Sequence, residues 1–231
     1  MTVARAIDLT HRYGGTLTVD RVNLDVATGR VIGLLGPPGA GKTTLIKLFA
    51  GLIVPTGGTV EVNGGDPRKP RTRRRIGVAL HETGFPQALR VSEVIDYVSA
   101  HHGDPCARDD LLELFDLHDV QHRRAATLNP GLKRRLAVAL AFTGRPDVVF
   151  LDGPATGVDA GGRHTLWNAI TTYRTDGGTV VLTGRRLSQV EAIADRVVVL
   201  DTGRVIADDG VDAIRNRHQP AARVPATFAR P

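Results

Sequence analysis

The sequence has 231 residues, of which 42% are hydrophobic and 23% charged, as is typical of a globular protein, and its longest apolar run, Leu136–Phe142, is far shorter than the roughly 20 residues of a membrane span. The single cysteine, Cys106, excludes an internal disulfide and a thiolate metal cluster. A formal charge of +6 favours polyanionic ligands, but no aromatic residue accompanies the arginines of 71–75, so we interpret this run as exposed surface and expect no specific nucleic-acid partner.

The first third of the sequence predicts strands on either side of a Gly- and Pro-rich turn. Ala4–Leu9 and Arg21–Val26 alternate apolar and polar residues, which is typical of half-exposed antiparallel strands. Val31–Leu35 is a continuous apolar run, as expected of a strand buried on both faces, and a helical stretch, Gly41–Ala50, follows the turn. The next two predicted strands are Thr59–Val62 and Arg75–Ala79.

From residue 88 to about residue 143 the apolar residues follow a helical period instead. Three segments show it: Val91–Ala100, Ala107–Phe115 and Leu132–Phe142. Strands and helices then alternate again, with strands at Val148–Leu151, Thr179–Thr183 and Arg196–Leu200 and helices at Arg163–Tyr173 and Leu187–Ala194. This order predicts an α/β fold with a mainly parallel sheet and a helical subdomain inserted at about 88–143. We expect residues 1–217 to form one domain and residues 218–231 to be a loose C-terminal tail.

The turn after Val31–Leu35 carries a phosphate-binding motif. Its residues fit G-x-x-x-x-G-K-[ST] at every fixed position and stand between a predicted strand and a predicted helix. In such a P-loop, backbone N–H groups surround a phosphate, the ammonium of Lys42 reaches the outer phosphates, and the hydroxyl of Thr43 ligates Mg²⁺. The candidate nucleotide-binding residues are Gly36, Pro37, Pro38, Gly39, Ala40, Gly41, Lys42, Thr43 and Thr44, with ATP and Mg²⁺ as the expected cofactors.

A second apolar strand ends in a carboxylate about a hundred residues later. Val148–Leu151 is followed by Asp152, and a strand beside the P-loop strand would hold this aspartate near the metal, as in P-loop NTPases generally. Thr43 and Asp152 are therefore the candidate Mg²⁺ ligands.

The order of these motifs resembles that of ABC transporter ATPase domains, from about Val3 to Ile214. The resemblance is carried by Tyr13, the P-loop, the helical block, Asp152 and the segment Thr156-Gly157-Val158-Asp159. It implies a P-loop NTPase core with an antiparallel β lobe, and it is greatest for ATPase subunits of bacterial drug and polysaccharide exporters, whose membrane domains are separate chains. By this resemblance Tyr13 stacks on adenine, although it also fits an ordinary edge-strand aromatic, and Asp159 helps couple two sites across a dimer.

The signature segment departs from the family pattern. Where the family has LSGGQ, this chain has Leu128-Asn129-Pro130-Gly131-Leu132, and Pro130 removes one backbone N–H donor. Asn129 is as good a helix N-cap as serine, and proline is well accepted at the first helical position, so we expect the following helix to form. Asn129 and Gly131 remain candidate contacts to a nucleotide held by an opposing subunit, with weakened binding.

The residues that the resemblance links to hydrolysis are replaced. Gly153 stands where the family has the glutamate that acts as general base, Arg185 where it has a histidine, and His81 at the position of the Q-loop glutamine. A well-placed general base contributes about 10²–10⁴ in rate, and glycine has no group to accept a proton. Glu82 is one residue late to replace the base. We therefore expect Mg·ATP binding with slow or absent turnover and assign no catalytic residue.

The resemblance also implies partners and a location. ABC domains pair head to tail, so we expect a second ABC subunit, in a homodimer or in a heterodimer with a competent ATPase, and an integral membrane transport subunit. We expect the chain to be cytoplasmic and to reach the inner face of the membrane through that partner, because no charged-then-apolar segment opens it. The alternative function is a non-transport ABC-type switch or assembly factor that dimerises on binding ATP. A nucleic-acid-handling ABC protein is disfavoured, since such proteins usually have paired domains or long insertions.

Overall fold

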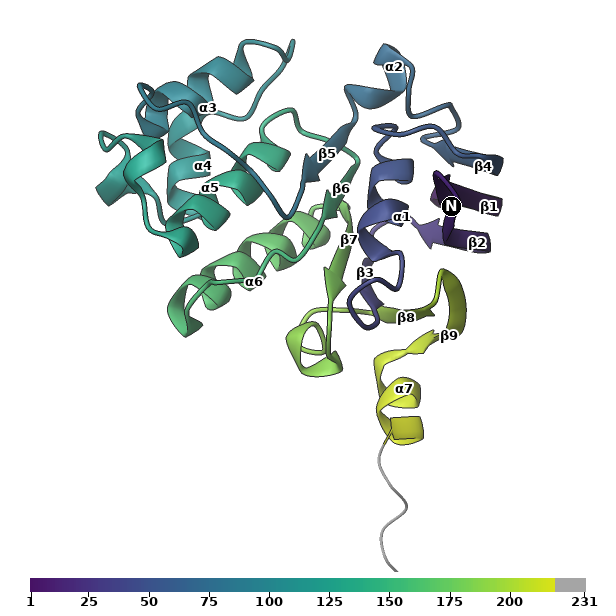
Figure 1. Ribbon diagram of the computed structural model, residues 1–231. Coiled ribbons are helices and arrows are strands. Elements are labelled where there is room, and N and C mark those ends of the chain that lie inside the picture. The colour runs from purple at the N-terminus through teal and green to yellow at the C-terminus, as the bar shows by residue number, and fades with distance from the viewer. Residues whose placement is uncertain (219–231) are drawn as a thin grey trace, which may run out of the picture.

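The computed structural model describes residues 1–218, which fold around two β-sheets. The smaller sheet has the order β2-β1-β4 and is antiparallel. Its strands are β1 (Thr2–Tyr13), β2 (Thr16–Ala27) and β4 (Gly57–Val62), drawn at the right of Figure 1. Alternating side chains of β1 and β2 are buried, which is the pattern predicted for half-exposed strands. The predicted antiparallel lobe is thus confirmed.

The larger sheet has the order β5-β6-β7-β3-β8-β9 and is parallel from β5 to β8. Its strands are β3 (Val31–Leu35), β5 (Ile76–Ala79), β6 (Val148–Leu151), β7 (Thr179–Gly184), β8 (Arg196–Asp201) and β9 (Arg204–Gly210), the last antiparallel to β8. Every residue of β3, β6 and β7 is buried, as expected of strands covered on both faces. The predicted α/β class with a mainly parallel core sheet is confirmed.

Helix α1 (Lys42–Phe49) joins the two sheets through one apolar core. Its buried residues Leu45, Leu48 and Phe49 belong to the same cluster as side chains of β1, β2 and β6. Phe49 stacks on Phe150 with ring centroids 5.5 Å apart. This packing fixes α1, and with it the end of the P-loop, against the centre of the larger sheet.

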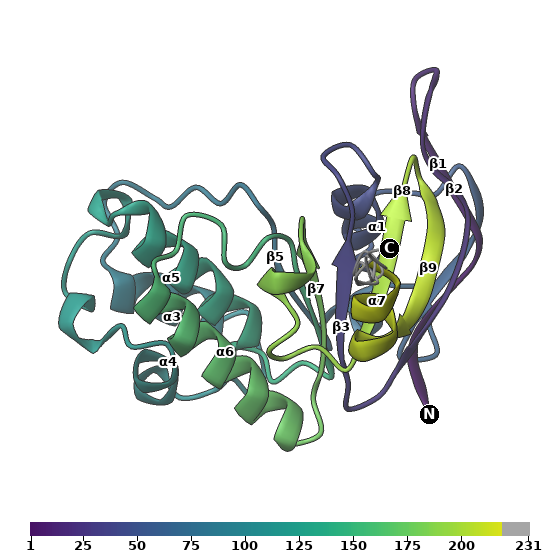
Figure 2. The ribbon, with the colours of Figure 1, turned by 90° about the horizontal axis from the view of Figure 1, so that it is seen from below.

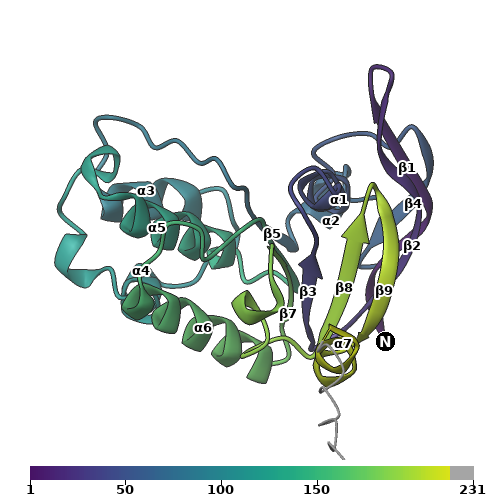
Figure 3. The same ribbon diagram turned by 60° about the horizontal axis from the view of Figure 1, so that its bottom comes forward.

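The helical block lies between β5 and β6 in the chain and to the left of the sheet in Figure 1. It consists of α3 (Val91–Ser99), α4 (Arg108–Leu114) and α5 (Pro130–Phe142), with single 3₁₀ turns at His118–Val120 and Ala125–Thr127. Figures 2 and 3 show α6 (Ala160–Thr175) running beside α5. All three predicted helices of the block are present within a few residues of their expected ends.

One predicted helix is wrong, and five elements of the described chain were not predicted. Leu187–Ala194 forms a 3₁₀ turn, Leu187–Gln189, and then a separate turn, because Val190 is buried against the sheet: a Cβ added to Gly33 would lie 2.9 Å from its Cγ2. The elements that were not predicted are α2 (Pro70–Arg73), β9, α7 (Val211–His218) and the two 3₁₀ turns of the helical block. The predicted tail, 218–231, lies outside the described residues beyond His218. Within residues 1–218, every helix is too short or too polar to cross a bilayer.

Candidate nucleotide-binding site

The P-loop connects the carboxyl end of β3 to the first turn of α1. Gly41 precedes the helix with φ +97°, and a Cβ at this position would lie 2.4 Å from the backbone oxygen of Thr18, so only glycine fits here. On the same side, the N–H of Gly203 in the β8–β9 turn donates to the oxygen of Ala40 at 3.2 Å. The loop is therefore held by the hairpin and by that turn, with the positive end of α1 at its mouth.

Lys42 spans the loop. Its Nζ donates to the backbone oxygens of Gly36 at 2.7 Å and of Pro37 at 2.8 Å. Burial lowers the pKa of Lys42 below its usual value; Asp152 opposes this effect and Arg185 adds to it. A partly desolvated ammonium held across a ring of backbone groups is suited to bind phosphate oxygens.

Thr43, Asp152, Thr183 and Gly153 form a continuous hydrogen-bond network. The Thr43 hydroxyl donates to Oδ2 of Asp152 at 2.7 Å, and the Thr183 hydroxyl donates to Oδ1 at 2.7 Å. Thr183 in turn accepts a hydrogen bond from the N–H of Gly153 at 2.7 Å. Asp152 is buried, and each of its two carboxylate oxygens accepts one of these hydroxyl hydrogen bonds. The structure thus brings together the two predicted metal ligands, Thr43 and Asp152.

A buried arginine supports this network from behind. Arg134, on α5, is 6% exposed, and its guanidinium donates to the backbone oxygens of Leu80 and Asp152. Burial lowers its pKa to about 10, with Asp152 opposing the shift. Arg134 therefore ties the helical block to the ends of β5 and β6.

Position 153 is shaped for glycine. Gly153 has φ +64°, a left-handed conformation that disfavours other residues. A Cβ here would lie 2.9 Å from the hydroxyl oxygen of Thr156 and 3.1 Å from Nδ1 of His81. The sequence interpretation treated 153 only as a missing carboxylate, whereas the structure shows that His81 stands in the adjoining space.

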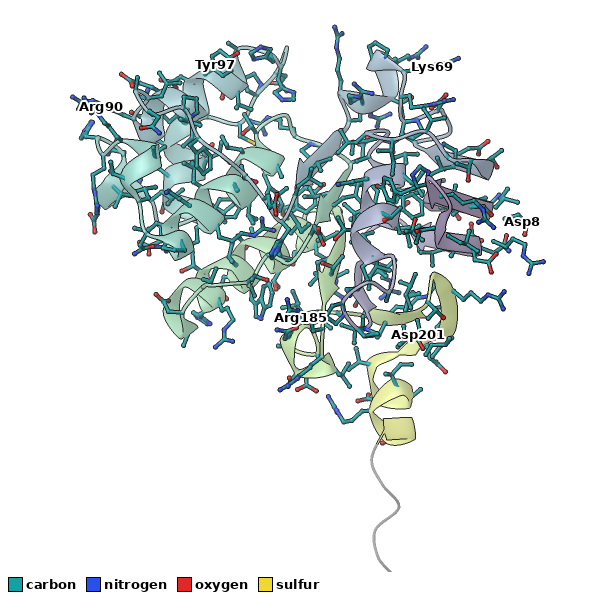
Figure 4. The ribbon with its side chains drawn as sticks, viewed as in Figure 1. Asp8, Lys69, Arg90, Tyr97, Arg185 and Asp201 are labelled. Atoms are coloured by element: carbon teal, nitrogen blue, oxygen red, sulfur yellow. The ribbon has the colours of Figure 1, made fainter. Side chains whose placement is uncertain are left out.

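These groups line one cleft of about 600 Å³ between the P-loop and the loop after β6. Among the residues that the structure describes, the charged ones lining it are Lys42, Arg163, Arg185 and one acid, Asp152. Trp167, the one tryptophan of the sequence, also lines it. Figure 4 labels Arg185 at the loop that follows β7. Three cations facing one carboxylate make the cleft attractive to a polyanion.

The signature residues are placed by the start of α5. Asn129 is the N-cap, and its Oδ1 accepts the N–H of Leu132 at 2.8 Å with Pro130 at the first helical position, so the predicted capping is confirmed. Gly131 lies near the segment Thr156-Gly157-Val158-Asp159, since a Cβ on it would be 3.4 Å from the oxygen of Gly157. The contacts of Asn129 and Gly131 with a nucleotide on an opposing subunit remain predictions.

Asp159 and Tyr13, the remaining predicted site residues, are not among the residues that line the cleft. Asp159 caps α6, accepting the N–H of Gly162 at 2.7 Å. Tyr13 ends β1, is 47% exposed and meets the ring of His11 edge-on with centroids 4.6 Å apart. The β1–β2 hairpin tip projects from the molecule in Figures 2 and 3, and its Thr18 lines the cleft while Tyr13 does not. Adenine stacking by Tyr13 and a dimer role for Asp159 stay predictions.

The donor set fits a magnesium nucleotide. The loop offers backbone groups, a helix N-terminus and Lys42 for phosphates, and the oxygens of Thr43 and Asp152 are the hard ligands that Mg²⁺ takes together with phosphate oxygens. When bound, the ion would neutralise phosphate charge beside Asp152.

The supporting residues of this site, Thr183 and Arg134, are not predicted by the sequence motifs. Thr183 stands at the carboxyl end of β7, one residue before the strand ends, which is nearly the signal by which Asp152 was found, so it could have been recognised. Arg134 could not, because it stands in the basic run Lys133–Arg135, which is typical of exposed surface. Glu82 is exposed and is not among the residues that line the cleft.

Comparison with known proteins gives a consistent result. Residues 19–156 match the sequence profile of the ABC transporter family. The daunorubicin resistance ATP-binding protein DrrA3 of Streptomyces coeruleorubidus is 36% identical over 212 residues, which are 88% of this chain and 67% of that protein. The daunorubicin/doxorubicin resistance ATP-binding protein DrrA of Streptomyces peucetius is 38% identical, covering 85% of this chain and 62% of that protein.

The Nod factor export ATP-binding protein I of Mesorhizobium japonicum is 33% identical, covering 91% of this chain and 64% of that protein. The chain thus spans about two thirds of the length of these relatives. A solved ATP-binding subunit of an ABC transporter superposes with a TM-score of 0.84 at 25% identity, covering 94% of this chain and 93% of that one. A dimeric ATP-binding cassette bound to ADP and Pi shares the fold, with a TM-score of 0.82 at 19% identity and coverage of 90% and 98%.

Proposed function

Since this chain belongs to the ABC transporter family of ATP-binding proteins, we propose that it is the ATP-binding subunit of an exporter, which binds Mg·ATP but hydrolyses it slowly or not at all. In this proposal it drives or regulates a separate membrane subunit and holds the nucleotide at an interface with a second cassette.

The observation that carries this proposal is the contrast within the cleft. The groups needed to bind are assembled, with Lys42 across the loop and Thr43 bonded to Asp152. At position 153 a left-handed glycine, enclosed by Thr156 and His81, replaces the group that would activate water. Arg185 also lines the cleft; a guanidinium stabilises phosphate charge but does not relay a proton at neutral pH.

The exporter assignment rests on the relatives. The similar proteins of Streptomyces are drug resistance ATP-binding proteins, and those of Mesorhizobium japonicum and Ralstonia nicotianae are Nod factor export ATP-binding proteins. We extend from these only the class, an ATP-binding subunit of an exporter, and not the transported molecule.

A heterodimer with a competent ATPase is the favoured assembly. In a homodimer both sites would combine Gly153 with a signature that contains Pro130. In a heterodimer the partner's P-loop site would keep its own glutamate and receive only the altered signature. Purification as a stable, hydrolysing homodimer would exclude this preference.

The test is a paired measurement of Mg·ATP binding and ATP hydrolysis by the purified chain, with Lys42→Ala as the control. We expect binding that depends on Lys42 and turnover at the level of the Lys42→Ala protein. Turnover that is robust and lost in Lys42→Ala would show that another group serves as the base and would overturn the proposal.

A second candidate is an ABC-type switch that dimerises on ATP without a transporter. The missing side chain at Gly153 favours it, because ATP that is not hydrolysed would keep the closed dimer together. Purification from membranes separates the two: an integral membrane protein that co-purifies with the chain supports the exporter, and its absence favours the switch.

A further inference from the structure

The imidazole of His81 stands where a side chain at position 153 would project. A Cβ on Gly153 would be 3.1 Å from Nδ1 and 3.7 Å from Cε1 of this ring. Because Gly153 has no side chain, the His81 ring can occupy the volume beside it. The two departures from the family pattern, at positions 153 and 81, are therefore structurally linked.

The backbone just before His81 is fixed against the nucleotide machinery. Asp152 donates its N–H to the oxygen of Ala79 at 2.9 Å, and Arg134 donates to the oxygen of Leu80 and to that of Asp152. His81 follows directly and lines the same cleft as Lys42. The side chain itself is exposed toward the cleft, so its ring is free to meet a ligand.

With an imidazole in place of a carboxylate, this volume holds a hydrogen-bond donor where the family has only an acceptor. A carboxylate only accepts hydrogen bonds and carries negative charge, whereas a neutral imidazole always has one N–H donor and a protonated ring has two. A general base must lie within hydrogen-bond reach of the water that attacks the terminal phosphate, so a ring in the base's place faces that phosphate. Asp152 is the only acidic residue among the described residues that line the cleft.

We propose that His81 is a phosphate ligand of this chain, whose ring donates a hydrogen bond to the terminal phosphate of bound ATP in the volume beside Gly153. This inference rests on the proposed function, in which the cleft binds ATP. It makes the cleft a site that retains ATP, because a donor replaces the group that would direct water to the phosphorus.

The first experiment measures the affinities of His81→Ala and wild type for Mg·ATP and Mg·ADP. Trp167 lines the cleft and is the only tryptophan of the sequence, so its fluorescence reports binding, with equilibrium dialysis as an independent readout. We expect His81→Ala to weaken ATP binding about tenfold, the size of one hydrogen bond to a charged group, with less than a twofold effect on ADP. Glu82→Ala is the matched control, since Glu82 is exposed and outside the cleft, and should change neither affinity.

The second experiment couples the two positions. Gly153→Ala should displace the ring and lower the ATP-to-ADP preference, and combining it with His81→Ala should add no further loss of preference. Gly177→Ala is the control, because Gly177 also has a left-handed conformation, with φ +90°, but lies outside the cleft, and a Cβ there would meet nothing within 4 Å. It should lower the thermal midpoint by about 2–4 °C and leave the preference unchanged.

The outcomes separate the inference from the function on which it rests. If wild type binds neither nucleotide in a Lys42-dependent way, the proposed function fails and this inference with it. If wild type binds both but His81→Ala keeps the ATP-to-ADP preference, only the assignment of His81 fails. Losses that add in the Gly153→Ala/His81→Ala protein would likewise overturn it, and the thermal midpoint of each variant verifies that the protein is folded.

Discussion

The guanidinium of Arg134 donates a hydrogen bond to the backbone oxygen of Asp152, the residue that holds the Thr43 hydroxyl. A second hydrogen bond from Arg134 reaches the oxygen of Leu80, one residue before His81. One side chain of the helical block thus fixes the two loops that shape the back of the nucleotide cleft.

Replacing Arg134 with alanine should destabilise the protein strongly. The substitution leaves two backbone oxygens without their donor and removes a buried side chain, so we expect the free energy of unfolding to fall by about 2–4 kcal/mol. Urea denaturation measures this. Arg108→Ala is the control: Arg108 pairs with Asp96 and both side chains are about half exposed, so its loss should cost less than about 1 kcal/mol. Equal losses for the two arginines would contradict the role given to Arg134.

The hydroxyl of Thr183 should matter for both stability and metal-dependent binding. Thr183→Val keeps the shape but leaves the N–H of Gly153 and one oxygen of Asp152 without their partner. We expect a loss of about 1–3 kcal/mol in unfolding free energy and weaker Mg·ATP binding. Thr183→Ser keeps the hydroxyl and should retain most of both. Denaturation together with Mg²⁺-dependent ATP titration gives the answer, and a valine variant that behaves like the serine variant would remove Thr183 from the network.

The cap of α5 is testable in isolation. Asn129→Ala removes the acceptor of the Leu132 N–H and should lower the free energy of unfolding by about 0.5–2 kcal/mol. Asn129→Ser restores the residue that the family pattern has here and keeps a capping oxygen. It should lower the free energy of unfolding by only about a few tenths of a kcal/mol. Hydrogen exchange of the first turn of α5 would locate the effect; unchanged exchange in Asn129→Ala would show that the cap is dispensable.

Substitution of Tyr13 should affect nucleotide binding but not folding. Because it is about half exposed at the hairpin, Tyr13→Ala should leave the thermal midpoint nearly unchanged. If the ring stacks on adenine, ATP affinity should fall by about 1–3 kcal/mol, and Tyr13→Phe, which keeps a ring, should bind nearly as wild type. Equal ATP affinity in the alanine variant and wild type would leave Tyr13 as an ordinary edge-strand aromatic.

The sequence predicted those features of the fold that are set by a few neighbouring residues. The P-loop, β3 and β6 were found because a continuous apolar run must be a strand covered on both faces, and the residues at its carboxyl end then point to one edge. Asn129 was recognised as a cap because capping involves only four successive positions, here 129–132.

The errors have tertiary causes. Leu187, Val190, Ile193 and Ala194 have helical spacing, yet Val190 is needed against the sheet between Gly33 and Gly184, and the helix gives way to two turns. Arg134 is charged, as surface residues usually are, but it is buried in this fold. Its partners are Leu80, which is 54 residues before it in the chain, and Asp152, which is 18 residues after it. The relation of His81 to Gly153 likewise exists only once β5 and β6 are paired.

The way the P-loop is held also sets an order of events during synthesis. The loop is translated early, but β3 pairs with Thr179–Gly184 and Arg196–Asp201, and Ala40 accepts the N–H of Gly203 in the turn beyond them. The phosphate cradle therefore cannot be finished until nearly all of the described chain has left the ribosome, since the contacts that close it span so much of the sequence. ATP, which binds the completed cradle and not its parts, would then stabilise only chains that have finished folding.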